Sequence, residues 1–271
     1  MKRPETRMMV AFTLVIAIAL ALGRPSFAQD MQPASGPTSQ TPRGESRIEV
    51  GLAFAQTIGA SNFSSSQSIR EHAEDGTFKS SYKVGGSPGG GFDLQYNLSG
   101  KFGVRLGAQT FSRKSTGTFE AQVPHPFFFA RPRSVSGTRG GLGFSEAAYS
   151  LTGVYRAGSG KWRVNFEGGP AYFSVNATVA EKVNYGEVYP YDTATFSGIV
   201  SVKKKASPFG VAVGLEVGRE LTKSVSVVAQ GRFTQGSGDI DVNGQKINIK
   251  AGGAQARLGL RIILARKRVV S

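Results

Sequence analysis

The sequence predicts an all-β fold, a single eight-stranded antiparallel up-and-down barrel, and three observations support it. Apolar and polar side chains alternate in eight stretches between residues 47 and 265, which is the period of a β-strand. Turns of three or four residues and much longer segments join these stretches in strict rotation. After the N-terminal 28 residues, no long unbroken apolar run occurs. If the chain enters a membrane, strands must therefore hold it there.

The N-terminus predicts export. Basic residues at positions 2, 3 and 7 precede an apolar run from Met8 to Leu22, and Ser26 and Ala28 have the small-x-small spacing of a cleavage site. We interpret residues 1–28 as a secretory signal, cleaved between Ala28 and Gln29. A retained anchor helix is the alternative, but the run is shorter than the ~20 residues that span a bilayer.

Composition limits the remaining possibilities. Residues 29–46 contain little that could be buried and are expected to form a disordered periplasmic leader. The chain has no Cys, so neither disulfides nor a lipidated cysteine is expected. The net charge of +15 falls to +12 on removal of four basic residues and one acidic residue with the signal. Because the chain is exported, anionic lipid or polysaccharide is the expected counter-charge, and nucleic acid is not.

The expected strands follow from the alternation. In the first, Ile48, Val50, Leu52 and Phe54 share one face, and in the last, Leu258, Leu260 and Ile262 oppose Arg257 and Arg261. An expected bulge interrupts the alternation at Gly168-Gly169-Pro170. The expected strands cover residues 47–57, 90–98, 102–113, 146–157, 162–178, 208–219, 224–235 and 246–265.

The connections have two lengths. Three tight turns, at residues 99–101, 158–161 and 220–223, are expected to face the periplasm. Four long segments, at 58–89, 114–145, 179–207 and 236–245, are expected as extracellular loops. Weak alternation at 77–84 and 194–202 indicates that strands could extend beyond the membrane.

The chemistry of the two faces favours lipid outside and a polar interior. The less apolar face is rich in Gly, Ala and Ser with an occasional charge, which suits a narrow lumen. A soluble barrel of the lipocalin type, with the apolar face inside, is the competing interpretation. Aromatic residues near both strand ends predict two interfacial girdles: Phe102, Tyr155 and Trp162 at the short turns, and Phe54, Phe92, Tyr149, Phe209 and Phe233 at the long segments.

Residues 257–264, RLGLRIIL, carry a polar residue, a Gly two positions on and hydrophobics at alternate positions. This segment is similar to the terminal β-signal of small Gram-negative outer-membrane barrels. Residues 47–265 as a whole resemble the OmpA-type transmembrane domain and the OmpX-like group of the porin family. The resemblance implies an outer-membrane location and recognition by the barrel-assembly machinery. The sequence departs from that group in lacking an aromatic ending and in its basic tail, residues 266–271.

Ten charged residues are expected to point into the lumen. Because buried charge is unfavourable unless paired, they predict an internal ion-pair network, for instance Glu216 with Arg163. A gated ion path through the narrow lumen is the functional alternative. The ten residues are Glu49, Asp93, Arg105, Arg156, Arg163, Glu167, Glu216, Arg232, Arg257 and Arg261.

Catalysis, metal binding and cofactor binding have little support. The chain resembles the lipid A deacylases and palmitoyltransferases in architecture, and such enzymes use a His with a Ser and an acid. Here only His72 and His125 exist, and both lie in long segments. Without Cys or paired His, no transition-metal site is expected. Gly100-Lys101 and Gly160-Lys161 lack the other residues of a phosphate loop, so no cofactor is expected.

The long segments carry the remaining candidates. Phe127, Phe128, Phe129, Arg131 and Arg133 combine aromatic and basic side chains, which is typical of a contact site for an external surface ligand. The alternative is that the Phe side chains cap the mouth of the barrel or pack on neighbouring loops. A second set is either solvated surface charge or, as our hypothesis, forms salt bridges with lipopolysaccharide phosphates: Arg113, Lys114, Lys203, Lys204 and Lys205. The sequence thus favours a structural, surface-exposed or adhesive outer-membrane protein without catalysis; a narrow channel and a lipid A-modifying enzyme are the alternatives.

Overall fold

The computed structural model describes residues 46–58, 61–99, 101–158 and 161–266. The predicted signal, its cleavage site, the leader and the tail lie outside these residues, apart from Ser46 and Arg266. Eleven strands account for most of the described chain: β1 (Ser46–Ile58), β2 (Ser61–Glu71), β3 (Glu74–Val84), β4 (Pro88–Asn97), β5 (Phe102–Val123), β6 (Arg133–Ala157), β7 (Trp162–Glu187), β8 (Ala194–Ala206), β9 (Phe209–Glu220), β10 (Val225–Val242) and β11 (Gln245–Arg266).

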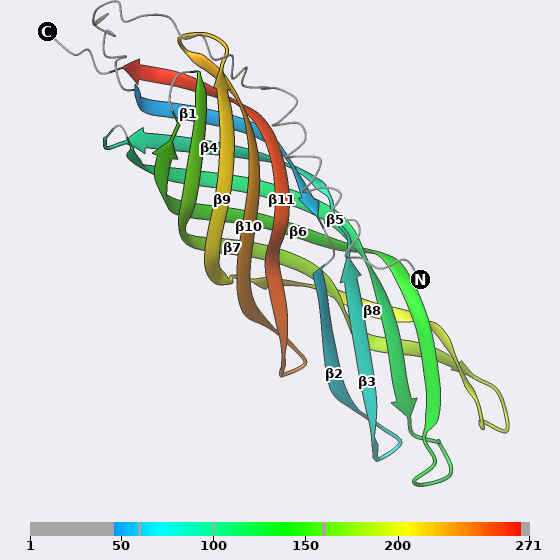
Figure 1. The fold of residues 1–271 in the computed structure, drawn as a ribbon. Coiled ribbons are helices and arrows are strands. Elements are labelled where there is room, and N and C mark those ends of the chain that lie inside the picture. The colour runs from blue at the N-terminus through cyan, green and yellow to red at the C-terminus, as the bar shows by residue number, and fades with distance from the viewer. Residues whose placement is uncertain (1–45, 59–60, 100, 159–160, 267–271) are drawn as a thin grey trace, which may run out of the picture.

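Eight of these strands form a closed antiparallel ring, which we call the membrane barrel (Figure 1). Its order is β1, β4, β5, β6, β7, β9, β10, β11, and pairing of β1 with β11 closes it. Leu52 pairs with Leu260 across this closure and with Phe92 of β4 on the other side. The eight strands correspond to the eight predicted from the alternation, so the predicted barrel is confirmed.

The other three strands build a second tier, the extension, beyond one end of the ring (Figure 1). The hairpin of β2 and β3 attaches to β5 through β3, and β8 pairs with β7. Strands β5, β6 and β7, of 22, 25 and 26 residues, run through both tiers. The segments predicted as long loops are therefore mostly strand, as the weak alternation at 77–84 and 194–202 indicated.

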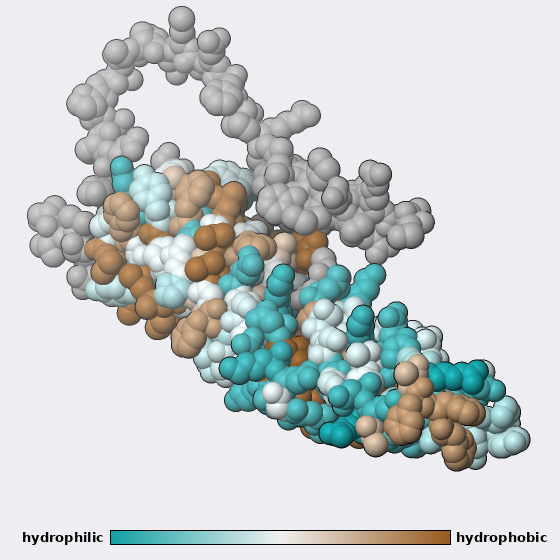
Figure 2. Space-filling view, turned by 90° about the horizontal axis from the view of Figure 1, so that it is seen from below, coloured by the Kyte–Doolittle hydropathy of each residue, from teal (hydrophilic) through white to brown (hydrophobic). Residues whose placement is uncertain are grey.

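The two tiers have opposite polarity: the membrane barrel is apolar outside and charged inside, whereas the extension is polar outside and apolar inside. On β5, Leu106 points outward and is 55% exposed while the adjacent Arg105 is buried in the lumen. Further along the same strand the outward residues are Thr118 and Glu120, and Phe119 is buried inside. Side chains of β5 alternate between the two faces without a break between these points. Near Phe111 the outward face therefore changes from apolar to polar, and the inward face changes from polar to apolar. Figure 2 shows the result as an apolar end and a mainly hydrophilic end.

The interior of the extension is an apolar core. Phe63 stacks on Tyr82 with ring centroids 4.6 Å apart, and Phe119 packs edge-on against Tyr82 at 5.9 Å. The Tyr82 hydroxyl accepts a hydrogen bond from the Ala180 amide at 2.7 Å, which joins β3 to β7 across the core. All eight strands of this tier contribute, with Phe63, Phe78, Phe119, Val135, Val179, Ala206, Ile240 and Ile249 among the buried residues. The extension therefore has the lipocalin-like polarity that the membrane barrel lacks.

The predicted bulge at Gly168-Gly169-Pro170 is wrong. These three residues pair in unbroken register with β9, and the register with β6 is the same on either side of them. Small residues at this point weakened the hydropathy pattern without changing the backbone. Irregular pairing occurs elsewhere: between Ser46 and Glu49 at the start of β1, and in the extension between Ser115 and Gly117 and between Ala180 and Lys182. The described residues include no helix both long and apolar enough to cross a membrane.

Candidate functional site

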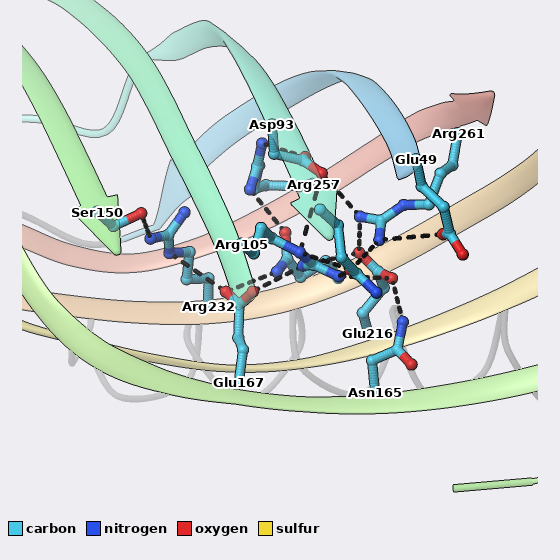
Figure 3. A network of polar contacts seen from close by, with 12 residues as sticks. Glu49, Asp93, Arg105, Ser150, Asn165, Glu167, Glu216, Arg232, Arg257 and Arg261 are labelled. Carbon is cyan, nitrogen blue, oxygen red and sulfur yellow. Dashed lines mark hydrogen bonds and ion pairs between the residues drawn. The ribbon is translucent and has the colours of Figure 1, made fainter. Parts of the chain in front are cut away.

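The lumen of the membrane barrel is occupied by a network of charged side chains (Figure 3). Arg105 of β5 lies at its centre: Nη1 is 2.6 Å from Glu167 Oε2 on β7 and 3.1 Å from Glu216 Oε2 on β9. Arg261 of β11 reaches Glu216 Oε2 at 2.7 Å and Asp93 Oδ1 of β4 at 2.9 Å. Because these strands are not neighbours in the ring, the ion pairs bridge the lumen.

The remaining predicted charges join the same network near the two ends of the lumen. Glu49 lies 2.9 Å from Arg156 and 3.2 Å from Arg163. Arg232 Nε lies 3.5 Å from Glu167, and Arg257 Nη2 lies 3.7 Å from Asp93. The structure thus brings all ten predicted residues together. The specific pair proposed from the sequence is wrong, because Arg163 pairs with Glu49 and Glu220 while Glu216 pairs with Arg105 and Arg261.

Neutral side chains complete the network, and the sequence analysis did not assign them this role. The ten charges comprise six arginines and four carboxylates, so further acceptors are needed. Gln95 Oε1 accepts from Arg105 Nη2 at 2.6 Å and from Arg261 Nη1 at 2.5 Å. Gln230 Oε1 accepts from Arg257 at 2.7 Å, and Ser150 Oγ accepts from Arg232 at 2.6 Å. The sequence does indicate their direction, because each occupies a position in the strand alternation that faces inward.

A separate ion pair marks the boundary between the charged lumen and the apolar core. Arg113 Nη2 lies 3.4 Å from Glu146 Oε2, and the Arg113 guanidinium lies 5.0 Å from the Phe144 ring centroid. Glu146 also accepts the Gly252 amide at 3.2 Å. Arg113 was predicted to meet lipopolysaccharide; this is wrong, since its side chain points inward.

Three of the lysines predicted with Arg113, namely Lys114, Lys203 and Lys205, lie on the outer surface, as expected. Lys204 pairs with the buried Ala177, so it lies at an inward position of β8 and is partly buried. Lys114 of β5 and Lys203 and Lys205 of β8 line one groove of about 640 Å³ that runs over β6 and β7. Lys204 also borders it. Lys205 pairs with Asn176 and Lys203 with Thr178, so residues far apart in the sequence meet on one face.

The tip of the extension is formed by the β5–β6 and β7–β8 connections. Phe127 and Phe129 are 68% and 79% exposed, and Tyr189 of the neighbouring connection is 81% exposed. Phe128 and Val188 are also exposed. We call these five residues the aromatic tip: Phe127, Phe128, Phe129, Val188 and Tyr189. Figure 2 shows an apolar patch near the far end of the hydrophilic tier.

Buried polar groups hold the aromatic tip in place. His125 Nδ1 accepts the Phe127 and Phe128 amides at 3.1 and 3.2 Å. Arg133 donates to the Tyr191 and Pro124 carbonyls, each at 2.9 Å, and to Glu187 at 2.5 Å. Arg133 was predicted as a contact residue; this is wrong, because it is only 5% exposed and ties the two connections together. Arg131 is exposed, as expected, and lies 3.3 Å from Asp192.

The two histidines have different surroundings. His72 is a turn residue between β2 and β3 with a φ of 52°. His125 uses Nδ1 as an acceptor, and its Nε2 lies 3.9 Å from Asp192. No cluster of three or more metal-ligating side chains occurs within the described ranges.

Solved structures with a similar arrangement include Neisserial surface protein A, with a TM-score of 0.41 and 9% identity over 80% of this chain and 97% of that one. Ail, the attachment invasion locus protein of Yersinia pestis, has a TM-score of 0.36 and 9% identity over 80% and 98%. The outer membrane protease OmpT from Escherichia coli has a TM-score of 0.39 and 9% identity over 80% and 97%.

No protein-family model matches the chain, and no curated protein matches it. The assignment therefore depends on the chain's own geometry. A closed ring of eight strands, an apolar outer belt and a charged interior are the features of an outer-membrane barrel. The chain is an eight-stranded outer-membrane β-barrel protein with a stranded extension beyond the membrane.

Proposed function

We propose that the protein is a surface-exposed binding protein that makes adhesive contacts through the aromatic tip. The observation that carries this proposal is the exposure of five large apolar side chains at the point furthest from the membrane barrel. From Phe111 to Val123, β5 advances twelve residues, which is about 40 Å along the strand at ~3.3 Å per residue. Exposed apolar clusters on an otherwise polar surface mark interaction sites.

The way the tip is built supports a binding role. Arg133 and His125 are buried beneath it and fix both connections, so little conformational freedom is lost when a partner binds. Phe127 packs on Tyr191 with centroids 5.5 Å apart, and the Arg131 guanidinium lies 5.6 Å from the Phe128 ring. Aromatic and arginine side chains of this kind dominate the energetics of protein interfaces.

A non-catalytic role is part of the proposal. Nδ1 of His125 already accepts two backbone amides, so this nitrogen is not free to act as a base. The arginines and carboxylates of the lumen are bound to one another, so these groups are already occupied and are not free to act on a substrate.

The test compares cells that display the whole protein or variants of it. Cells are applied to a panel of surfaces coated with purified proteins, glycans or hydrocarbon, and retention is measured after washing. We expect the triple variant Phe127→Ser/Phe128→Ser/Phe129→Ser to lose retention several-fold on a surface that holds the wild type. The matched control is Val200→Ser, an exposed apolar residue on the side of the extension, which should behave as wild type. Equal retention of the triple variant and the wild type on every surface would refute the proposal.

A further inference from the structure

The outer face of β5, β6 and β7 carries two adjoining grooves of opposite chemistry. The lower groove, of about 430 Å³, lies in the apolar belt, with Ala108 flanked by the rings of Phe92 and Tyr149 and with Tyr172 and Phe209 beyond. The upper groove, of about 640 Å³, is the one bordered by Lys114, Lys203 and Lys205.

The two grooves form one continuous surface because they share the same strands. Ala108 and Ser112 are four residues apart on β5, Tyr149 and Ser145 on β6, and Tyr172 and Asn176 on β7. Four residues correspond to about 13 Å along a strand. The basic groove therefore begins directly above the apolar one, on the side away from the membrane.

The apolar groove has the shape of a trough for a hydrocarbon chain. One row of pairs crosses it: Phe92 with Ala108, Ala108 with Tyr149, and Tyr149 with Tyr172. The small Ala108 forms the floor between two rings, and Tyr172 and Phe209, with ring centroids 5.1 Å apart, form the far wall. Aromatic rings at this height mark the upper interface of the belt.

The basic groove is suited to an anionic group at the level of lipid headgroups. Its floor carries the short polar side chains of Ser145, Asn176 and Thr178, between Lys114 on one side and the β8 lysines on the other. Its described lining residues include no Asp or Glu. At a comparable height on the other side of the ring, β10 presents Gln235, Ser237 and Asp239 outward.

We propose that this face binds a single molecule of a phosphorylated, multiply acylated glycolipid of the outer leaflet, the chemistry of lipid A. The lysine ammonium groups of Lys114, Lys203 and Lys205 bind its phosphate, and an acyl chain lies over Ala108 between the rings. Phosphate oxygens form charge-assisted hydrogen bonds with ammonium donors. The neighbouring trough adds apolar contact that a soluble phosphate compound could not use. This site is independent of the aromatic tip, which lies at the far end of the extension.

Native mass spectrometry of the whole protein, extracted from outer membranes in mild detergent, tests the proposal. We expect the wild type to retain a single lipid of lipid A mass. Charge reversal by Lys114→Glu/Lys203→Glu/Lys205→Glu should lower its occupancy several-fold, and Ala108→Trp should do so by filling the trough.

Matched controls separate this site from general effects of charge and bulk. Lys79→Glu/Lys246→Glu/Lys250→Glu makes the same charge change at exposed lysines on β3 and β11, and Ala229→Trp adds the same ring to the outer face of β10. Both controls should retain the lipid, and all variants should keep the gel mobility shift on boiling.

A second assay titrates delipidated protein with lipid A and with the same lipid after phosphatase treatment, and only the phosphorylated form should bind tightly. Equal occupancy in site and control variants, retention of glycerophospholipid instead, or equal affinity for the dephosphorylated lipid would overturn the proposal.

Discussion

At the scale of single residues, the stability of the membrane barrel depends on pairing of buried charge. Arg105 and Glu216 are each 2% exposed, so both charges are shielded from bulk solvent. Arginine remains charged in proteins, so each buried guanidinium needs acceptors inside the lumen. Glu216 supplies them to both Arg105 and Arg261 and also accepts from Asn165 at 2.7 Å.

Glu216→Gln is therefore expected to destabilise the barrel strongly. The amide retains the size of the carboxylate but removes its charge, which leaves Arg105 and Arg261 with one fewer carboxylate to balance them. Loss of one member of a buried pair costs about 3–5 kcal/mol, measured here as the free energy of unfolding in urea of the refolded protein in lipid. Glu120→Gln, at an outward position of β5, is the control and should change that free energy by less than about 0.5 kcal/mol. Equal unfolding midpoints for the two variants would contradict the proposed role of the network.

At the scale of elements, the sequence predicted the eight ring strands because each alternates between apolar and polar residues. It missed the extent of the extension because the alternation there uses Ser and Thr outside and fewer large residues inside. On β3, Phe78, Ser80, Tyr82 and Val84 point inward. Only Phe78 and Tyr82 are large, so the apolar pattern of this strand is weak. The tight turn of Asn243-Gly244, with φ values of 54° and 77°, is a hairpin signal that was present in the sequence.

Other features could not have been inferred from one sequence. The β2–β3 turn uses His72 and Ala73 at φ values of 52° and 66°, where neither residue type indicates a turn. The inward direction of Arg113 follows from parity, but its partner Glu146 is set by pairing of β5 with β6. Likewise, the charged residues of the lumen could be predicted because they occupy inward positions in the strand alternation. Which of them form ion pairs with each other depends on how the ring closes.

The two-tier organisation predicts that the membrane barrel does not need the hairpin of β2 and β3. Gln56 of β1 already pairs with Pro88 of β4, so a short turn can replace residues 59–86. We expect the shortened protein to keep its gel mobility shift on boiling, while protease trims the opened extension and leaves a membrane-protected core. As the control, His72→Asn/Ala73→Gly keeps the hairpin and gives its turn the favoured residues, so its extension should resist protease. Loss of the mobility shift in the shortened protein would show that the tiers fold as one unit.

At the scale of the whole molecule, the same strands lie in two different surroundings, the lipid of the membrane and water. The outward face meets hydrocarbon in the membrane barrel and water in the extension, and the inward face changes from ion pairs to a hydrocarbon core in the same direction. In a membrane, backbone polar groups must be satisfied by a closed ring, which the β1–β11 pairing provides. In water, the extension needs an apolar interior, which the continuation of the same strands provides.

The exchange of faces along β5 is the central claim, and single-cysteine labelling tests it most directly because the natural chain has no Cys. Leu106→Cys, Thr118→Cys and Phe119→Cys are each labelled in proteoliposomes, and quenching by brominated lipid is compared with reaction toward a membrane-impermeant maleimide. A fluorophore at position 106 should be quenched by lipid, position 118 should react with the water-soluble reagent, and position 119 should do neither. Lipid quenching at position 118, or reaction with the impermeant maleimide at position 106, would contradict the account.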